Sequence, residues 1–164
     1  MYLKIAIVCL CFLLNACGFQ PLYGHDRTVL DQTSAVQIQP IAGEGGYQME
    51  LILQNRLNPH AFQNTQKYRL TVTLSQPKYV NQSIRNDNFA SLESMSIKAS
   101  YQLSDIQSGA ILIQSQVDSN GLFNLIDDPY ATVMGQNKLY DNLIQLMADD
   151  IATHVLSYFK GKTE

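Results

Sequence analysis

One segment of the chain alternates between apolar and polar residues at every step. Its apolar members are Met95, Ile97, Ala99, Tyr101 and Leu103, and its polar members are Ser94, Ser96, Lys98, Ser100 and Gln102. Successive side chains of a β-strand point to opposite faces, so a period of two predicts a strand with one covered and one open face. The chain must therefore contain a sheet with a core on one side only.

Two further segments are predicted to join this strand. Tyr68, Leu70, Val72 and Leu74 alternate with Arg69, Thr71, Thr73 and Ser75, and Pro77 ends the pattern. The segment 81–88 is polar and is expected to be a turn. Asp105 to Gly109 has the spacing of a tight hairpin connection to a strand over Ala110–Val117. We expect these three strands to form an antiparallel meander.

The remaining elements are a short strand and two helices. A strand is predicted over Ala35–Ile41, and the glycines of residues 43–46 end it at a turn that starts a helix over Tyr47–Leu57. Asp128 and Pro129 are typical of a helix start. Apolar residues then recur at steps of three and four up to Phe159. About 30 helical residues would span ~45 Å, which suggests that the helix end projects beyond the sheet.

The order strand, helix, strand, strand, strand, helix predicts an α+β fold. We expect a two-layer sandwich in which a four-stranded, mostly antiparallel sheet carries both helices on one face. The other face would present a hydrophilic, weakly charged set: Arg69, Thr71, Thr73, Ser94, Ser96, Lys98, Ser100 and Gln102. Such a face is either simply solvated or in contact with another polar wall, such as the lumen of a wide β-barrel.

The N-terminus is predicted to be a targeting signal rather than part of the fold. Lys4 precedes an apolar run over residues 5–14, which is too short to span a membrane and typical of a cleaved signal. The sequence Leu14-Asn15-Ala16-Cys17 is similar to a bacterial lipobox, although Asn15 is atypical; an ordinary signal cleaved nearby is the alternative. We expect a signal peptide over 1–16, a lipidated tether over 17–33 that begins at Cys17, and a single domain over 34–160.

Charge and motifs exclude several classes of function. Eleven Lys and Arg against 14 Asp and Glu give a net charge of −3 without any basic run, so nucleic-acid binding is not expected. For the same reason, the mature chain is not expected to hold anionic lipid through a general basic patch. The acyl chains would supply the membrane attachment.

The sequence offers no constellation for catalysis. It has no Gly-x-Ser-x-Gly, Walker or His-x-x-x-His pattern. Asp127 and Asp128 are explained by helix capping, Asp149 and Asp150 by a solvated helix side, and His154 by a position at the edge of the apolar stripe. We expect no catalytic residues, no metal and no cofactor.

The first residues after the lipobox carry a specific resemblance. Cys17 runs directly into Gly-Phe-Gln-Pro-Leu-Tyr-Gly, residues 18–24. Support continues in Tyr-Arg-Leu at 68–70, in Ala-Ser-Tyr-Gln-Leu-Ser-Asp at 99–105 and in Asp-Pro-Tyr-Ala at 128–131. In these motifs and in the order of its elements, the chain resembles the lipopolysaccharide-assembly lipoprotein family LptE from Cys17 to about Phe159.

This resemblance implies a lipoprotein on the periplasmic side of the outer membrane. It would plug the barrel of LptD and help to insert lipopolysaccharide into the outer leaflet, and Gly18 after the cysteine is consistent with sorting to that membrane. Family members are thought to touch lipopolysaccharide phosphates through basic residues, one of them in the turn where Arg85 stands. A second basic position, near the start of the last helix, falls about Gly135, and the nearby candidate is Lys138. An ordinary solvated turn arginine is the alternative for Arg85.

Two other classes of function compete with this interpretation. A stand-alone periplasmic lipid-binding lipoprotein would be a monomer with a pocket and no obligate partner. An envelope hydrolase would need an accessible nucleophile or a metal cluster, which the sequence does not provide.

Overall fold

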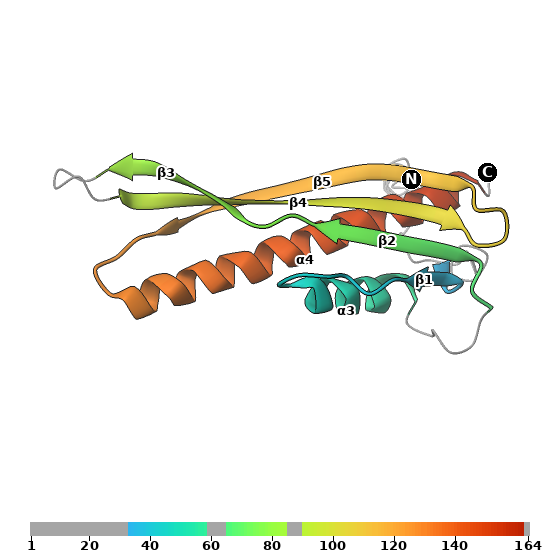
Figure 1. Cartoon of the computed structure of the whole chain (residues 1–164), viewed down its shortest axis with the longest axis horizontal. Coiled ribbons are helices and arrows are strands. Elements are labelled where there is room, and N and C mark those ends of the chain that lie inside the picture. The colour runs from blue at the N-terminus through green and yellow to red at the C-terminus, as the bar shows by residue number, and fades with distance from the viewer. Residues whose placement is uncertain (1–32, 59–64, 85–89, 163–164) are drawn as a thin grey trace, which may run out of the picture.

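A computed structural model describes residues 33–58, 65–84 and 90–162. Along the chain, the elements are β1 (Val36–Ile38), α3 (Gly46–Leu57), β2 (Tyr68–Leu74), β3 (Lys78–Ile84), β4 (Ala90–Asp105), β5 (Ile111–Asn124) and α4 (Pro129–Gly161). Figure 1 shows a sheet in one layer and both helices in a second layer on the same face of it. The predicted α+β two-layer sandwich is confirmed.

The long strand β4 is the centre of the sheet. Its antiparallel partner β5 follows it from Leu92, opposite Asn124, to Ser104, opposite Ile111. The other edge of β4 is shared by two strands in turn, β2 near its C-terminal end and β3 near its N-terminal end. The short strand β1 then pairs with β2 in parallel. Three of the four pairings are thus antiparallel, as the sequence predicts.

The sequence prediction missed strand β3. Lys78–Ile84 is a strand paired with β4, whereas the segment 81–88 was expected to be a turn, and the sheet therefore has five strands rather than four. The polar residues Asn81 and Ser83 lie in a strand because β4 is long enough to offer them backbone partners, Glu93 and Leu92. Pro77 interrupts the edge between β2 and β3, since proline has no N–H to donate to a ladder.

Three other element lengths differ from expectation. Strand β1 covers Val36–Ile38 rather than Ala35–Ile41, and β5 covers Ile111–Asn124 rather than Ala110–Val117. Helix α4 does not outrun the sheet. Its 33 residues span ~50 Å, and the 16 residues of β4 span ~54 Å. The sequence pattern thus overestimated β1 and underestimated β5, whose second half is only partly buried.

The core lies between the sheet and the two helices. The inward residues Met95, Ile97, Ala99 and Leu103 of β4 are fully buried. They pack in one cluster with residues of α3 such as Leu53 and with the inner side of α4: Leu143, Ile144, Met147, Ile151, Val155 and Phe159. The ring of Phe159 also lies 4.9 Å from that of Tyr68, centroid to centroid. The two helices thus cover the apolar face of β4, as its alternating pattern predicts.

Local signals explain where the helices begin. The Asp128 carboxylate accepts hydrogen bonds from the N–H groups of Tyr130 at 2.9 Å and Ala131 at 3.4 Å, so the predicted cap of α4 is confirmed. Helix α3 begins at a glycine turn, as expected. A Cβ atom on Gly46 would lie 2.1 Å from the carbonyl oxygen of Ile41, which leaves no room for any other residue.

Candidate interaction surface on the open face of the sheet

The outward face of the sheet carries polar side chains in rows across three strands. The register places Thr73, Ser100 and Gln116 side by side in one row, on β2, β4 and β5. The next row toward the β4–β5 hairpin contains Thr71, Gln102 and Gln114. We call the outward side of β2, β4 and β5, built around these two rows, the open face.

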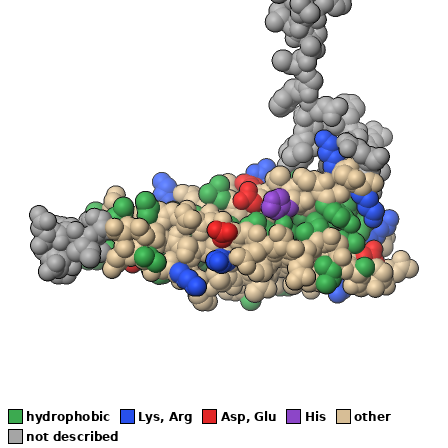
Figure 2. Space-filling model, turned by 90° about the horizontal axis from the view of Figure 1, so that it is seen from above, with side chains coloured by type: hydrophobic (Ala, Val, Ile, Leu, Met, Phe, Trp, Pro, Cys, Tyr) green, Lys and Arg blue, Asp and Glu red, His purple; other side chains and the backbone are tan. Residues whose placement is uncertain are grey.

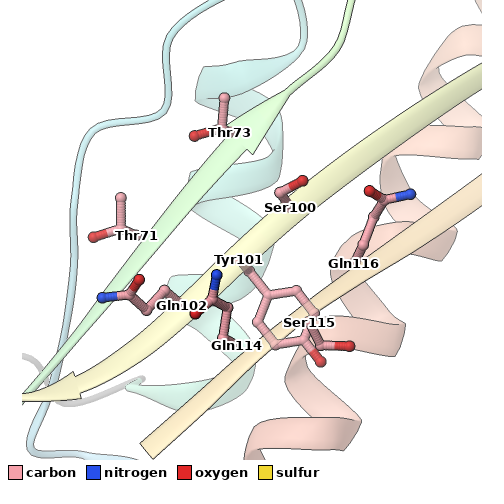
Figure 3. A pocket seen from close by; sticks show the side chains of 8 residues that line it. All are labelled: Thr71, Thr73, Ser100, Tyr101, Gln102, Gln114, Ser115 and Gln116. Carbon is pink, nitrogen blue, oxygen red and sulfur yellow. The ribbon is translucent and has the colours of Figure 1, made fainter. Parts of the chain in front are cut away.

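These two rows line a shallow depression of about 440 Å³. Its lining consists of Thr71, Thr73, Ser100, Tyr101, Gln102, Gln114, Ser115 and Gln116. Figure 3 shows the hydroxyl and carboxamide groups standing along adjacent strands. Every such group can both donate and accept hydrogen bonds, and none is charged. The surface therefore suits a partner that is polar and neutral.

Charges border this surface on both sides. Lys98 stands opposite Asp118 in the row beyond Ser100, and Lys78 stands near Ser96. Arg69 lies on the other side, opposite Ser104. Farther from the hairpin the face changes character, because Val80 and Leu122 are exposed there by 55% and 57%. The neutral polar zone is thus confined to the middle of the sheet.

All eight residues predicted for the open face lie on it. Arg69, Thr71, Thr73, Lys98 and Ser100 are exposed, and Ser94, Ser96 and Gln102 are half-buried. Their contact with a partner stays a prediction. The sequence interpretation predicted a strand over Ala110–Val117 but did not assign the outward residues of β5 to this surface: Gln114, Gln116, Asp118 and Asn120. The alternation of these residues with Ser115, Val117 and Ser119 was the signal that could have revealed them.

The other candidate residues are separate from this surface. Lys138 is exposed on α4, in the helix layer on the opposite side of the sheet. Arg85, the lipidation candidate Cys17, the predicted signal and all of the tether except Thr33 lie outside the described residues. The predicted roles of Arg85, Lys138 and Cys17 stay predictions.

Tyr101 and His154 connect the central strand to helix α4. The Tyr101 hydroxyl lies 2.7 Å from Nδ1 of His154, and the two rings stack with centroids 6.2 Å apart. Burial raises the pKa of Tyr101, and a hydrogen bond with Ser115 partly offsets that rise. This pair explains His154 as a residue that holds the two layers together, in keeping with its predicted position at the edge of the apolar stripe.

A second, smaller depression of about 160 Å³ lies between β1 and α3. Its polar lining includes Gln37, Glu50, Gln54, Asn58 and Gln66. Asn58 is buried, and its Nδ2 donates to the Val36 carbonyl at 3.2 Å. Most of the residues that line the two depressions are thus polar, whereas a site for an acyl chain is lined mainly by apolar residues.

Neither a metal cluster nor a spanning helix is found in the part of the chain that the structure describes. Within that part, no three His, Cys, Asp or Glu side chains gather in a way that could hold a metal ion. No described helix combines the length and the apolar character needed to cross a membrane.

Known proteins share this fold. No family model matches the chain. The uncharacterized protein RP188 of Rickettsia prowazekii (strain Madrid E) is 27% identical over 95% of this chain and 97% of its own length. A lipoprotein of Caulobacter crescentus CB15 has a similar structure, with a TM-score of 0.64, 22% identity and coverage of 82% of this chain and 96% of the other.

A second solved structure is similar over its whole length. The rare lipoprotein B of Shewanella oneidensis matches with a TM-score of 0.58 and 12% identity, over 78% of this chain and all of the other. At such identities the likeness establishes a common fold. The chain therefore has the fold of these bacterial lipoproteins.

Proposed function

We propose that this chain is an outer-membrane lipoprotein of the LptE type, which sits inside the barrel of LptD and assists the insertion of lipopolysaccharide into the outer leaflet. The observation that carries the proposal is the open face, with its uncharged polar rows across three strands. The interior of a wide β-barrel is polar, so its wall would offer hydrogen bonds to such a face. No catalytic step is part of the proposed role.

Three further observations support this proposal. The motif that follows Cys17 resembles the start of the LptE family. The fold is that of bacterial lipoproteins, one of them called rare lipoprotein B. The domain is elongated, with β4, β5 and α4 along its long axis, which is a shape that a barrel lumen can accommodate.

The cost of burying charged groups explains why the middle of the open face is neutral. A charged group that is moved from water to an interface without a partner loses its hydration and gains little in return. Hydroxyl and carboxamide groups lose less and can pair with many different donors and acceptors. Thr73, Ser100 and Gln116 are therefore suited to burial against a polar wall.

The competing role of a free lipid-binding lipoprotein receives less support. A lipid carrier requires an apolar cavity that shields acyl chains from water. Most of the residues that line the two depressions described above are polar. The open face is thus better suited to a protein wall than to a lipid tail.

The test is a mild-detergent purification of the tagged full-length protein from its own outer membranes, followed by mass spectrometry of the partners and of the N-terminal peptide. We expect an LptD-like barrel in equal amount and a diacylated Cys17. Recovery of the protein as a lone monomer that carries lipid would overturn the barrel role and support the lipid-binding alternative.

A pair of matched variants makes this test specific for the open face. The double variant Ser100→Glu and Gln116→Glu places two carboxylates in the proposed contact, and we expect recovery of the barrel to fall about tenfold or more. The control is Asn142→Glu with Gln145→Glu, which adds the same charge to exposed positions of α4. An equal loss in both variants would contradict a contact through the open face.

A further inference from the structure

Four basic residues that are far apart in the sequence lie together at one end of the molecule. They are Lys67, Arg69, Lys160 and Lys162, and we call this set the basic end. Figure 1 shows that the start of β2, the β4–β5 hairpin and the last turn of α4 meet at this end. Figure 2 shows Lys and Arg side chains gathered there.

Hydrogen bonds fix the relative positions of these segments. The Ile106 N–H in the hairpin donates to the Lys67 carbonyl at 2.9 Å, and Arg69 stands opposite Ser104 in the sheet. The pKa of Asp105 lies below its usual value, chiefly because the Ser108 N–H donates to the carboxylate; the Lys162 ammonium also contributes. The start of β2 and the C-terminal end of α4 thus place their cations at the same end of the molecule, next to the hairpin.

The rest of the described chain has the opposite charge balance. Among the described residues, the basic end holds four cations and the carboxylate of Asp105. The other described residues hold four cations and nine carboxylates. The sequence analysis expected no basic patch able to attract anionic lipid, because no basic run exists in the sequence. Folding brings basic residues of the segments 67–69 and 160–162 to the same end of the domain, and no basic run in the sequence indicates this.

The chain also enters the domain at the basic end. The Lys67 N–H donates to the Ala35 carbonyl at 2.9 Å, so Thr33, where the described chain begins, is close to the cations. Position 33 lies only 16 positions after Cys17 in the sequence. At ~3.4 Å per residue, even a fully extended chain of that length would keep this end within ~55 Å of the anchor.

We propose that the basic end binds the phosphate headgroups of anionic phospholipids in the leaflet that holds the lipid anchor. The proposal rests on the lipid anchor of the proposed function. Each Lys or Arg close to an anionic surface strengthens binding about fivefold.

Lys160 and Lys162 could also stabilise helix α4, and the test must distinguish this structural role from lipid binding. Cations at the C-terminus of a helix stabilise it through the helix dipole. A purely structural role would change the thermal midpoint and leave lipid affinity intact. Lys67 and Arg69 precede or begin a strand, so the helix dipole does not explain them.

The experiment measures sedimentation of the mature chain, residues 17–164, with vesicles. Cys17→Ser removes the acylation site, so binding does not depend on the anchor. We expect binding to vesicles that contain phosphatidylglycerol, weak binding to phosphatidylcholine alone, and release by salt, because screening shortens the reach of the field. Equal binding to both vesicles, or to neither, would overturn the proposal.

Charge-matched variants locate the site. Lys67→Gln with Lys162→Gln should weaken binding to the anionic vesicles about 25-fold. The control Lys78→Gln with Lys138→Gln removes the same charge elsewhere and should change binding less than about twofold. Arg69 is left intact because it borders the open face. Equal losses in both doubles, or a shifted thermal midpoint without any loss of binding, would contradict the proposal.

Two additional arms cover the other outcomes. Inorganic phosphate should release the protein no better than chloride at equal ionic strength; a specific effect would assign the basic end to free phosphate instead. If the unacylated chain does not fold, the acylated protein decides the question with a fluorescent label on Gln107→Cys in the hairpin. Headgroup quenchers should dim this label more in anionic than in neutral vesicles, and an equal effect would overturn the proposal.

Discussion

The two faces of strand β4 use the same backbone for opposite purposes. Met95, Ile97 and Leu103 point to the helices and are fully buried. The residues that alternate with them, such as Ser96 and Ser100, point outward and remain wholly or partly accessible to water. The covered face holds the domain together, whereas the open face contributes little to its stability and is free to serve a partner.

Leu103→Ala gives the largest contrast between the two faces. Removing a fully buried leucine loses its transfer free energy and leaves a cavity, so we expect the free energy of unfolding to fall by about 2–5 kcal/mol. The substitution Gln102→Ala, at the neighbouring position on the open face, should change the free energy of unfolding by no more than about 0.5 kcal/mol. Urea unfolding of the mature chain measures both. Similar losses in the two variants would show that the faces do not differ as described.

Tyr101→Phe tests a polar contact between the central strand β4 and helix α4. It removes the hydrogen bond between the Tyr101 hydroxyl and His154, and we expect a loss of about 1 kcal/mol. An unchanged unfolding free energy would show that this bond adds nothing to the attachment of α4.

The same tyrosine predicts a loss of stability in alkali. Burial raises the pKa of Tyr101, so the folded state keeps its proton at a pH at which the unfolded state has lost it. Stability should therefore fall as the pH rises from ~10 through the folded pKa, and less steeply in Tyr101→Phe. Urea midpoints at several alkaline pH values check this, and identical slopes in the two proteins would contradict it.

The smallest expected change in stability concerns the turn of the β4–β5 hairpin, which keeps these two strands in register. The Asp105 carboxylate accepts hydrogen bonds from Gln107 and Ser108 in the β4–β5 hairpin, which lowers its pKa. Its contribution is present above the unfolded pKa of ~3.9 and is lost as the pH falls through the folded value. Urea midpoints should therefore fall with acid less in Asp105→Asn than in the parent. A parallel fall would contradict the role of the turn.

The covered face could be predicted from sequence because its signal is local. Alternation around Met95 to Leu103 predicts the strand, and Asp128 with Pro129 predicts the start of α4. Strand β3 could not be predicted in this way. The segment around Asn81 and Ser83 has no apolar alternation, and it becomes part of a strand only because β4, which follows later in the chain, pairs with it.

The interaction surfaces depend on long-range pairing and were predicted only in part. Two strands of the open face follow from their own patterns, whereas Gln114 and Gln116 join it through the register with β4. The basic end gave no sequence signal, because about 90 residues separate Lys67 from Lys160. Local patterns therefore predict the elements, and the sites arise where the elements meet.

The parallel pairing of β1 has a mechanical consequence. Strand β1 begins at the basic end and runs along β2, so a pull from a membrane anchor would act along the strand axis. The bonds from Gln39 N–H to the Leu70 carbonyl, from Tyr68 N–H to the Ala35 carbonyl and from Asn58 Nδ2 to the Val36 carbonyl would then share the load. Such a shear arrangement resists force better than a strand that peels away one bond at a time, so a strand of only three residues can serve as the point where tension enters the domain.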